Sequence, residues 1–304
     1  MRVYLTGARG FVGSNLVRVF EAHGAEVLGP GREEVDVTDA AAVARSVADF
    51  RPDAVVHGAI LNDFGRLYSH REEAWAAYVG STRALTDAAN RAGAQLVLVS
   101  TDWVFDGSQG GADERTPPNP VNAYGFLKAA SELVVAERAE LGAVARLSGV
   151  NGVHWARPDT PRRQDAGFGY LVLSIVDALS RGDRFTVWDS TAINCIASPV
   201  LASAAAELIW RIVERRLTGT FHCCGAEAVG RRELALRTAG AFELDPELLD
   251  FGPPDPGALP PGAVPYDTSL SGPATERELD IGLPNLEALL SGLRAELELE
   301  RSPA

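Results

Sequence analysis

The chain has 304 residues, of which 46% are hydrophobic and 23% charged, as expected for a globular protein with one large or two modest domains. Its net charge of −13 argues against nucleic acid or an anionic membrane as a partner. No apolar run approaches the roughly 20 residues of a membrane span, and a strand-like run begins at Arg2 with no leader-like segment before it, which predicts a cytoplasmic protein. The cysteines have the spacing of neither a metal site nor a disulfide framework, and we expect no metal.

A glycine-rich turn follows the first predicted strand, residues 2–5, and precedes residues whose apolar side chains repeat at helical spacing. Glycines between a strand and a helix permit a tight turn and let the backbone approach a pyrophosphate. The sequence therefore predicts a dinucleotide site at this turn. The residues expected to contact the cofactor here are Gly7, Arg9, Gly10, Phe11, Val12 and Gly13.

The second predicted strand, residues 25–28, leads to Arg32. A carboxylate at this place would hold the ribose 2′-hydroxyl of NAD, whereas an arginine suits a 2′-phosphate. Arg32, with Arg9, therefore favours NADP(H) over NAD(H), although both arginines would also be ordinary in a solvated loop. Further along, Asp36 and Val37 are candidate cofactor contacts near the adenine, and for Asp36 a turn or capping role fits equally well.

The chain then continues with a helix over residues 40–50 and a third strand over residues 53–57. Ala59 lies just past the strand, where a small residue lets the cofactor pass close to the backbone. His57 is interpreted as a packed residue rather than a base. We expect a loop over residues 61–71 and a long helix over residues 73–91.

The apolar run of residues 96–99 predicts a buried parallel strand, at whose carboxyl end open α/β sheets bind their ligands. Ser100 is therefore a candidate cofactor contact and Thr101 a candidate catalytic residue. Tyr124 and Lys128 begin the next helix four residues apart, so both side chains share one face. The adjacent ammonium is expected to depress the pKa of the phenol and make it an acid. Lys128 is the only lysine, so this spacing arises by chance roughly 2% of the time.

Strands and helices alternate as far as a fifth strand over residues 143–148, which predicts an α/β fold with a doubly wound parallel Rossmann sheet. We expect a dinucleotide-binding domain at residues 1–148 and a smaller α/β substrate-binding lobe at residues 149–304, with segments that return to the first domain.

In the second part, helices are predicted from 170 to 180, to about 215, from 231 and over 286–299, with strands at 185–188 and 221–223 and a proline-rich linker at 252–265. A long loop over residues 106–122 could form a substrate lip. The arginines Arg157, Arg162 and Arg163 could hold a diphosphate or belong to a solvated loop.

These motifs together resemble the extended short-chain dehydrogenase/reductases and, within them, the dTDP-4-dehydrorhamnose reductase group. The resemblance covers nearly the whole chain, and its most distinctive part is Ser-Thr-Asp-Trp-Val-Phe-Asp-Gly at residues 100–107, where the group has tyrosine in place of tryptophan. It implies a sugar nucleotide substrate, hydride transfer from the nicotinamide to a ketone, and a homodimer. It also implies that Tyr124 protonates the developing alkoxide, that Lys128 binds the nicotinamide ribose and that Thr101 orients the carbonyl.

Two departures from the pattern concern the substrate and the proton relay. Gly149 stands where rhamnose-forming reductases tend to carry a tryptophan, and Tyr78 where the superfamily usually has an asparagine. A 4,6-dehydratase would need a glutamate at Trp103, and an epimerase that also reduces would need a cysteine in this run. A simple NAD-dependent epimerase and a non-catalytic regulatory subunit, like that of methionine adenosyltransferase, remain as alternatives.

Overall fold

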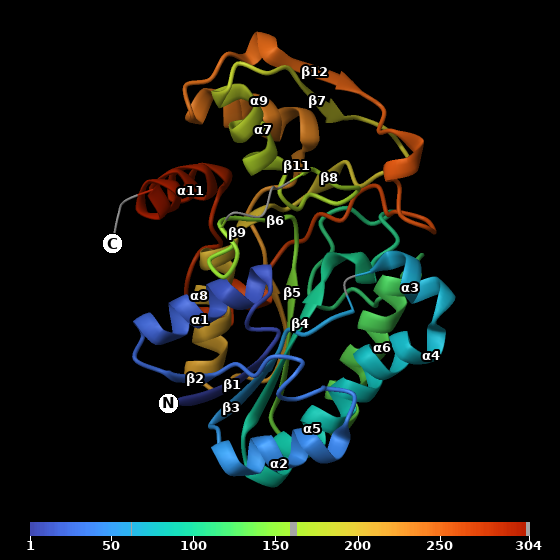
Figure 1. Cartoon of the computed structure of the whole chain (residues 1–304), viewed down its shortest axis with the longest axis vertical. Helices are drawn as coiled ribbons and strands as arrows, with labels where there is room; N and C mark the ends of the chain where they lie inside the picture. Colours follow the sequence, from blue (N-terminus) through green and yellow to red (C-terminus); the bar gives the residue numbers. More distant parts are fainter. Residues whose placement is uncertain (62, 159–162, 302–304) are drawn as a thin grey trace.

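A six-stranded parallel sheet organises the first half of the protein. The computed structural model describes residues 1–304 except 62, 159–162 and 302–304. The strand order is β10-β5-β4-β3-β1-β2, which confirms the predicted doubly wound α/β fold (Figure 1). The strands are β1 (Arg2–Thr6), β2 (Glu26–Leu28), β3 (Ala54–His57), β4 (Gln95–Thr101), β5 (Gly142–Leu147) and β10 (Gly219–Cys223).

Helices cover both faces of this sheet because the inner strands are apolar on both sides. One face packs against α1 (Phe11–Ala22) and α8 (Ala202–Glu214). The other packs against α2 (Ala40–Phe50), α5 (Ser81–Ala92) and α6 (Ala123–Arg138). The strand predicted at residues 221–223 lies in this same sheet as β10, parallel to β5, so the chain returns to the large sheet late in the sequence.

A second core lies above the carboxyl ends of these strands (Figure 1). It is built by α7 (Leu171–Ser180), α9 (Arg231–Ala241), α11 (Leu286–Arg301) and the parallel pair β7 (Phe185–Trp188) and β12 (Leu249–Gly252). Two short pairs join this part to the first: β8 (Ile196–Ala197) with β11 (Val229–Gly230), and β6 (Val150–Asn151) with β9 (Val200–Leu201). Among the described residues, no helix has both the length and the apolar character that crossing a bilayer requires.

Several sequence-based boundaries were wrong. The loop predicted at residues 61–71 contains α3 (Phe64–Ser69), which the Asp63 side chain caps by accepting from the backbone N–H of Arg66, and α4 (Arg71–Trp75) follows. A π-helical turn, Ala76–Gly80, joins α4 to α5. A helix α10 (Pro273–Leu279) also went unpredicted. The fifth strand, predicted over residues 143–148, is β5 and spans Gly142–Leu147.

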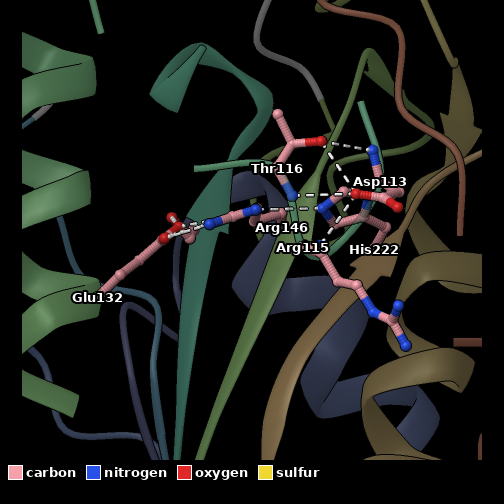
Figure 2. A network of polar contacts seen from close by, with 7 residues as sticks. Asp113, Arg115, Thr116, Glu132, Arg146 and His222 are labelled. Carbon is pink, nitrogen blue, oxygen red and sulfur yellow. Dashed lines mark hydrogen bonds and ion pairs between the residues drawn. The ribbon is translucent and has the colours of Figure 1, made fainter. Parts of the chain in front are cut away.

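A buried chain of polar groups ties α6 to the β4, β5 and β10 strands (Figure 2). Ser100 donates to Glu132 at 2.5 Å, and the Arg146 guanidinium binds the same carboxylate through Nε at 3.0 Å and Nη2 at 2.7 Å. On the far side, Arg146 Nη1 donates to His222 Nε2 at 3.3 Å, because His222 Nδ1–H donates to the carbonyl of Ser271. Burial and the Arg146 charge lower the His222 pKa to about 4, which keeps this acceptor neutral.

Two arginines of this protein each form a bidentate ion pair, one buried and one exposed, and their substitution should change the free energy of unfolding by very different amounts. Arg146→Leu leaves the buried Glu132 carboxylate without its cation and should lower the free energy of unfolding by roughly 3–5 kcal/mol in urea titrations. The matched control is Arg184→Leu, which removes a bidentate ion pair with Asp250. Because this pair is exposed to solvent, its loss should lower the free energy of unfolding by less than about 1 kcal/mol. Equal decreases in the free energy of unfolding of the two variants would show that burial of the Arg146–Glu132 pair does not matter for stability.

Candidate functional site

A cavity of about 1450 Å³ runs along the carboxyl edge of the large sheet, between the two cores. Its lining includes every residue that the sequence assigned to catalysis or to cofactor binding. These are Gly7, Arg9, Gly10, Phe11, Val12, Gly13, Arg32, Asp36, Val37, Ala59, Ser100, Thr101, Tyr124 and Lys128. Residues from β1 to β4 meet here because parallel strands end at a common edge.

The glycine-rich turn packs backbone against backbone at one end of the cavity. Gly7 has φ of +78°, and a Cβ on Gly13 would lie 1.9 Å from the carbonyl oxygen of Gly7. No side chain fits at either position, so α1 begins directly behind an open stretch of main chain. Such a cradle of bare main chain would suit the pyrophosphate of a dinucleotide, and the residues present fit such a cofactor.

At the middle of the cavity, Thr101 and Tyr124 lie side by side. The Thr101 hydroxyl donates to Asp102 at 3.0 Å and also takes part in a hydrogen bond with Tyr124 that favours the phenolate. Burial outweighs that bond and raises the Tyr124 pKa to about 12. The expected depression of this pKa is therefore wrong for the protein without cofactor, because desolvation penalises the phenolate more than its neighbours stabilise it.

Lys128 lies one turn further along α6 and is almost completely buried. Its ammonium donates to the carbonyl oxygen of Val99 on β4 at 2.8 Å and lies 5.6 Å from the ring centre of Tyr78. Burial lowers the Lys128 pKa to about 8, while Glu132 acts in the opposite direction. The side chain therefore keeps its charge near neutral pH and faces the cavity from a fixed position.

Asp102 is a site residue that the sequence analysis missed. Its buried carboxylate accepts from Thr101, from Ser148 at 2.8 Å and from Thr268 at 2.6 Å. Burial raises the Asp102 pKa to about 6 against these three hydrogen bonds. The carboxylate thus fixes Thr101 relative to a residue that follows β5 and to a loop late in the sequence. The signal available beforehand was its place directly after Thr101 in the distinctive run of residues 100–107.

Aromatic rings surround Tyr124. Phe64 on α3 and Trp103 lie 5.6 and 6.0 Å from it, centre to centre, and Phe64 also contacts Trp103. Tyr78 meets Tyr124 edge-on at 6.1 Å and donates its hydroxyl to the carbonyl of Leu61 at 3.1 Å. Phe64 could not be assigned from sequence because α3 was read as a loop.

The far end of the cavity carries the charged groups of the β2 loop. Arg32 approaches Asp36 at 3.7 Å, and Asp36 accepts from both the backbone N–H and the hydroxyl of Thr38, so the turn role of Asp36 is present in the structure.

The predicted packed role of His57 also agrees with the structure. Its buried ring hydrogen-bonds Thr6 and Ser81, and burial lowers its pKa to about 3.

The second core supplies the opposite wall. Gly149, Arg157 and the segment 165–170 line the cavity there. Gly149 has φ of +52°, and a Cβ on it would lie 3.1 Å from Pro199 Cα, so this position has no room for a large side chain without a shift of the backbone. Of the other arginines considered for a diphosphate, Arg163 is not part of the cavity lining, and Arg162 lies outside the described residues.

Fold and site together define a protein of the extended short-chain dehydrogenase/reductase type. The family model described as the RmlD substrate binding domain matches residues 1–261. The chain therefore belongs to this family.

Three individual proteins similar to this chain share 28%, 27% and 22% of their residues with it over the matched regions. The chain is 28% identical over 253 residues to methionine adenosyltransferase 2 subunit beta of Bos taurus, covering 80% of this chain and 72% of that protein. It is 27% identical over 306 residues to the probable low-salt glycan biosynthesis reductase Agl14 of Haloferax volcanii, covering 97% and 98%. The structure of dTDP-4-dehydrorhamnose reductase from Bacillus anthracis in complex with NADP has a TM-score of 0.80 at 22% identity, covers 97% of this chain and 99% of that one, and shows likeness of fold.

The buried position of Lys128 predicts a titration that is easy to assign, because this is the only lysine. Its ammonium should titrate near pH 8 in the folded protein rather than near its ordinary pKa of 10.5, since burial favours the neutral amine. The measurement is the ¹⁵Nζ chemical shift of lysine-labelled protein against pH, with the urea-unfolded chain as control. A folded midpoint above pH 10 would contradict the environment described here.

Proposed function

We propose that this protein is an NAD(P)H-dependent reductase of a 4-keto sugar or deoxysugar nucleotide, similar in action to dTDP-4-dehydrorhamnose reductase. The observation that carries the proposal is the placement of Thr101, Tyr124 and Lys128 on one wall of a single cavity, next to the glycine-rich cradle. The Haloferax and Bacillus relatives support it, since both are named as reductases.

The three side chains divide the chemistry among them. When bound, the nicotinamide cofactor supplies the hydride. Tyr124, whose raised pKa keeps the phenol protonated at neutral pH, donates its proton to the oxygen of the ketone as that oxygen gains charge. Thr101 donates a hydrogen bond to the same oxygen once its hydroxyl turns from Asp102 toward the substrate, and the buried Lys128 ammonium favours the negative charge that the reaction leaves on Tyr124. Lys128 also reaches the side of the cavity where the nicotinamide ribose would lie.

The second core lines the part of the cavity in which we place the substrate, so it limits the size of the substrate that can bind. The cavity is large enough for a dinucleotide and a further ligand, and Arg157 presents a cation on the wall opposite Tyr124. Because Gly149 stands where rhamnose-forming reductases tend to carry tryptophan, and its surroundings leave no room for a large side chain, we propose a related 4-keto sugar nucleotide rather than dTDP-4-dehydrorhamnose itself. A homodimer and a cytoplasmic location remain predictions from the sequence.

A regulatory role is the second candidate, and one observation favours it. Several curated relatives are beta subunits of methionine adenosyltransferase, which the chain matches over 80% of its length. An NAD-dependent epimerase is a third candidate, because the fold is also that of UDP-glucose 4-epimerase from Thermus thermophilus, with a TM-score of 0.72. A reductase consumes NADPH in proportion to sugar, an epimerase shows no net change, and a regulatory subunit binds cofactor without turnover.

Tyr124→Phe tests the reductase proposal. The variant keeps the ring but loses the transferable proton, so turnover should fall on the order of 10²-fold or more while cofactor binding stays nearly unchanged. The assay follows the absorbance of NADPH with dTDP-4-keto-6-deoxy sugars, and binding is titrated separately. Tyr266→Phe, which removes a hydroxyl from an exposed tyrosine outside the cavity lining, is the matched control.

The possible results separate the candidates. Unchanged turnover in Tyr124→Phe would remove the assigned proton donor. Tight cofactor binding by the wild type, with no oxidation of NADPH by any nucleotide sugar, would overturn the reductase proposal in favour of the regulatory or epimerase role.

We also propose that NADP(H) is favoured over NAD(H), because Arg32 lies beside the cavity and is mostly exposed. Arg32→Asp should weaken NADPH binding and shift preference toward NADH, since a carboxylate repels a 2′-phosphate. Fluorescence titration of both cofactors measures the shift, and Arg45→Asp on the exposed surface of α2 controls for the change in net charge. Equal NADPH affinity before and after the Arg32 substitution would contradict the assignment of Arg32 to the 2′-phosphate.

A further inference from the structure

The buried ammonium of Lys128 has few neighbours that compensate its charge. It donates to the carbonyl oxygen of Val99 at 2.8 Å, and among the residues that the structure describes no carboxylate forms an ion pair with it. Glu132 acts on Lys128 only from a distance, because its carboxylate is bound by Arg146 and Ser100. A buried cation is costly unless nearby groups replace the water that it has lost, so weaker contacts of Lys128 matter.

The aromatic ring of Tyr78 provides such a contact. Lys128 Nζ lies over this ring, 5.6 Å from its centre, where the π electrons attract a cation. The same ring meets the Tyr124 ring at an interplanar angle of 80° and a centre-to-centre distance of 6.1 Å. Tyr78 is only 3% exposed, so bulk water screens neither contact. One ring therefore contacts both the proposed proton donor and the cation beside it.

Backbone contacts hold Tyr78 in this position. Its hydroxyl donates to the carbonyl oxygen of Leu61 at 3.1 Å, and its own carbonyl accepts from the hydroxyls of Ser81 at 3.1 Å and Thr82 at 2.6 Å. The residue belongs to the π-helical turn Ala76–Gly80, a distortion that occurs frequently at functional sites. The ring is thus fixed against Lys128 from both ends.

The other ionisable groups that face Lys128 do not replace the ring. His57, at the end of β3, is neutral, because burial and the Lys128 charge lower its pKa to about 3. Tyr124 stays protonated, since burial raises its pKa to about 12. Burial lowers the Lys128 pKa to about 8 even though Glu132 opposes the shift. The ammonium therefore keeps its charge near neutral pH by a margin similar in size to one cation–π contact.

We infer that Tyr78 is a positioning residue whose ring keeps the Lys128 ammonium charged and in place beside Tyr124. The inference rests on the reductase function proposed above, in which this ammonium favours the phenolate that remains after proton transfer. Tyr78 itself transfers no proton, because burial and Tyr124 raise its pKa well above the ordinary value and its hydroxyl is bound to Leu61. What it contributes is the electron-rich face of its ring.

The titration of Lys128 tests this inference without substrate. Tyr78→Phe keeps the aromatic face, so the ¹⁵Nζ midpoint should stay close to that of the wild type. A trifluorinated phenylalanine at residue 78 keeps the shape of the ring but withdraws electron density from its face, so the midpoint should fall by about one pH unit. The matched control places the same amino acid at residue 4, because Tyr4 is fully buried and lies outside the cavity lining.

The pH dependence of turnover gives a second measurement. Because the proposed reaction uses the charged ammonium, kcat/KM for the keto sugar should decline as the pH rises through the Lys128 pKa. This decline should come about one pH unit lower with the trifluorinated ring than with Tyr78→Phe. A ring that only fills space would change the stability or the overall rate and leave this midpoint unmoved.

The results bear on the inference and on the reductase proposal separately. A midpoint that falls on fluorination at residue 78, and not at residue 4, supports the positioning role. Equal midpoints for the two rings at residue 78, or a higher one after fluorination, would overturn that role and leave the reductase proposal standing. Absence of NADPH oxidation by the wild type with every nucleotide sugar would overturn the reductase proposal, while the titration still decides whether the ring holds the ammonium.

Discussion

The position of Thr101, beside the proposed proton donor Tyr124, depends on the buried carboxylate of Asp102. Three hydroxyls donate to it, from Thr101 beside the donor, from Ser148 after β5 and from Thr268 in a late loop. A carboxylate out of water is stable only while such donors surround it, so the three segments are held at one point. The strand ends, the cavity wall and the return of the chain from the second core therefore share a common anchor.

Burial changes the pKa values of Tyr124 and Lys128 in opposite directions. The same loss of solvent raises the Tyr124 pKa to about 12 and lowers the Lys128 pKa to about 8. A phenol that resists ionisation keeps its proton until a stronger base develops next to it, which suits a donor in a reduction. A cation with a reduced pKa remains charged near pH 7, one helical turn from Tyr124.

The sequence was informative where local spacing determines structure. The glycines between β1 and α1, and the pair Tyr124 and Lys128 on one face of α6, predicted the sheet and the wall of the cavity because each pattern has a direct geometric consequence. It was uninformative where distant residues meet: Thr268 on Asp102, or Arg146 between Glu132 and His222, require the fold to be known. Helix α3 is too short to show periodicity, so Phe64 was missed, and the Tyr124 pKa could not be predicted without its burial.

The two ends of the cavity come from different parts of the chain. The bare backbone of the glycine-rich turn and the charges of the β2 loop, to which we assign the cofactor, lie close together in the sequence. The proposed turnover also uses Thr101, Tyr124 and Lys128, in a cavity whose lining includes Gly149, Arg157 and the segment 165–170. Because this chain has both sets, and Thr101 and Lys128 are buried, the reductase is the account that gives the buried ammonium of Lys128 a role.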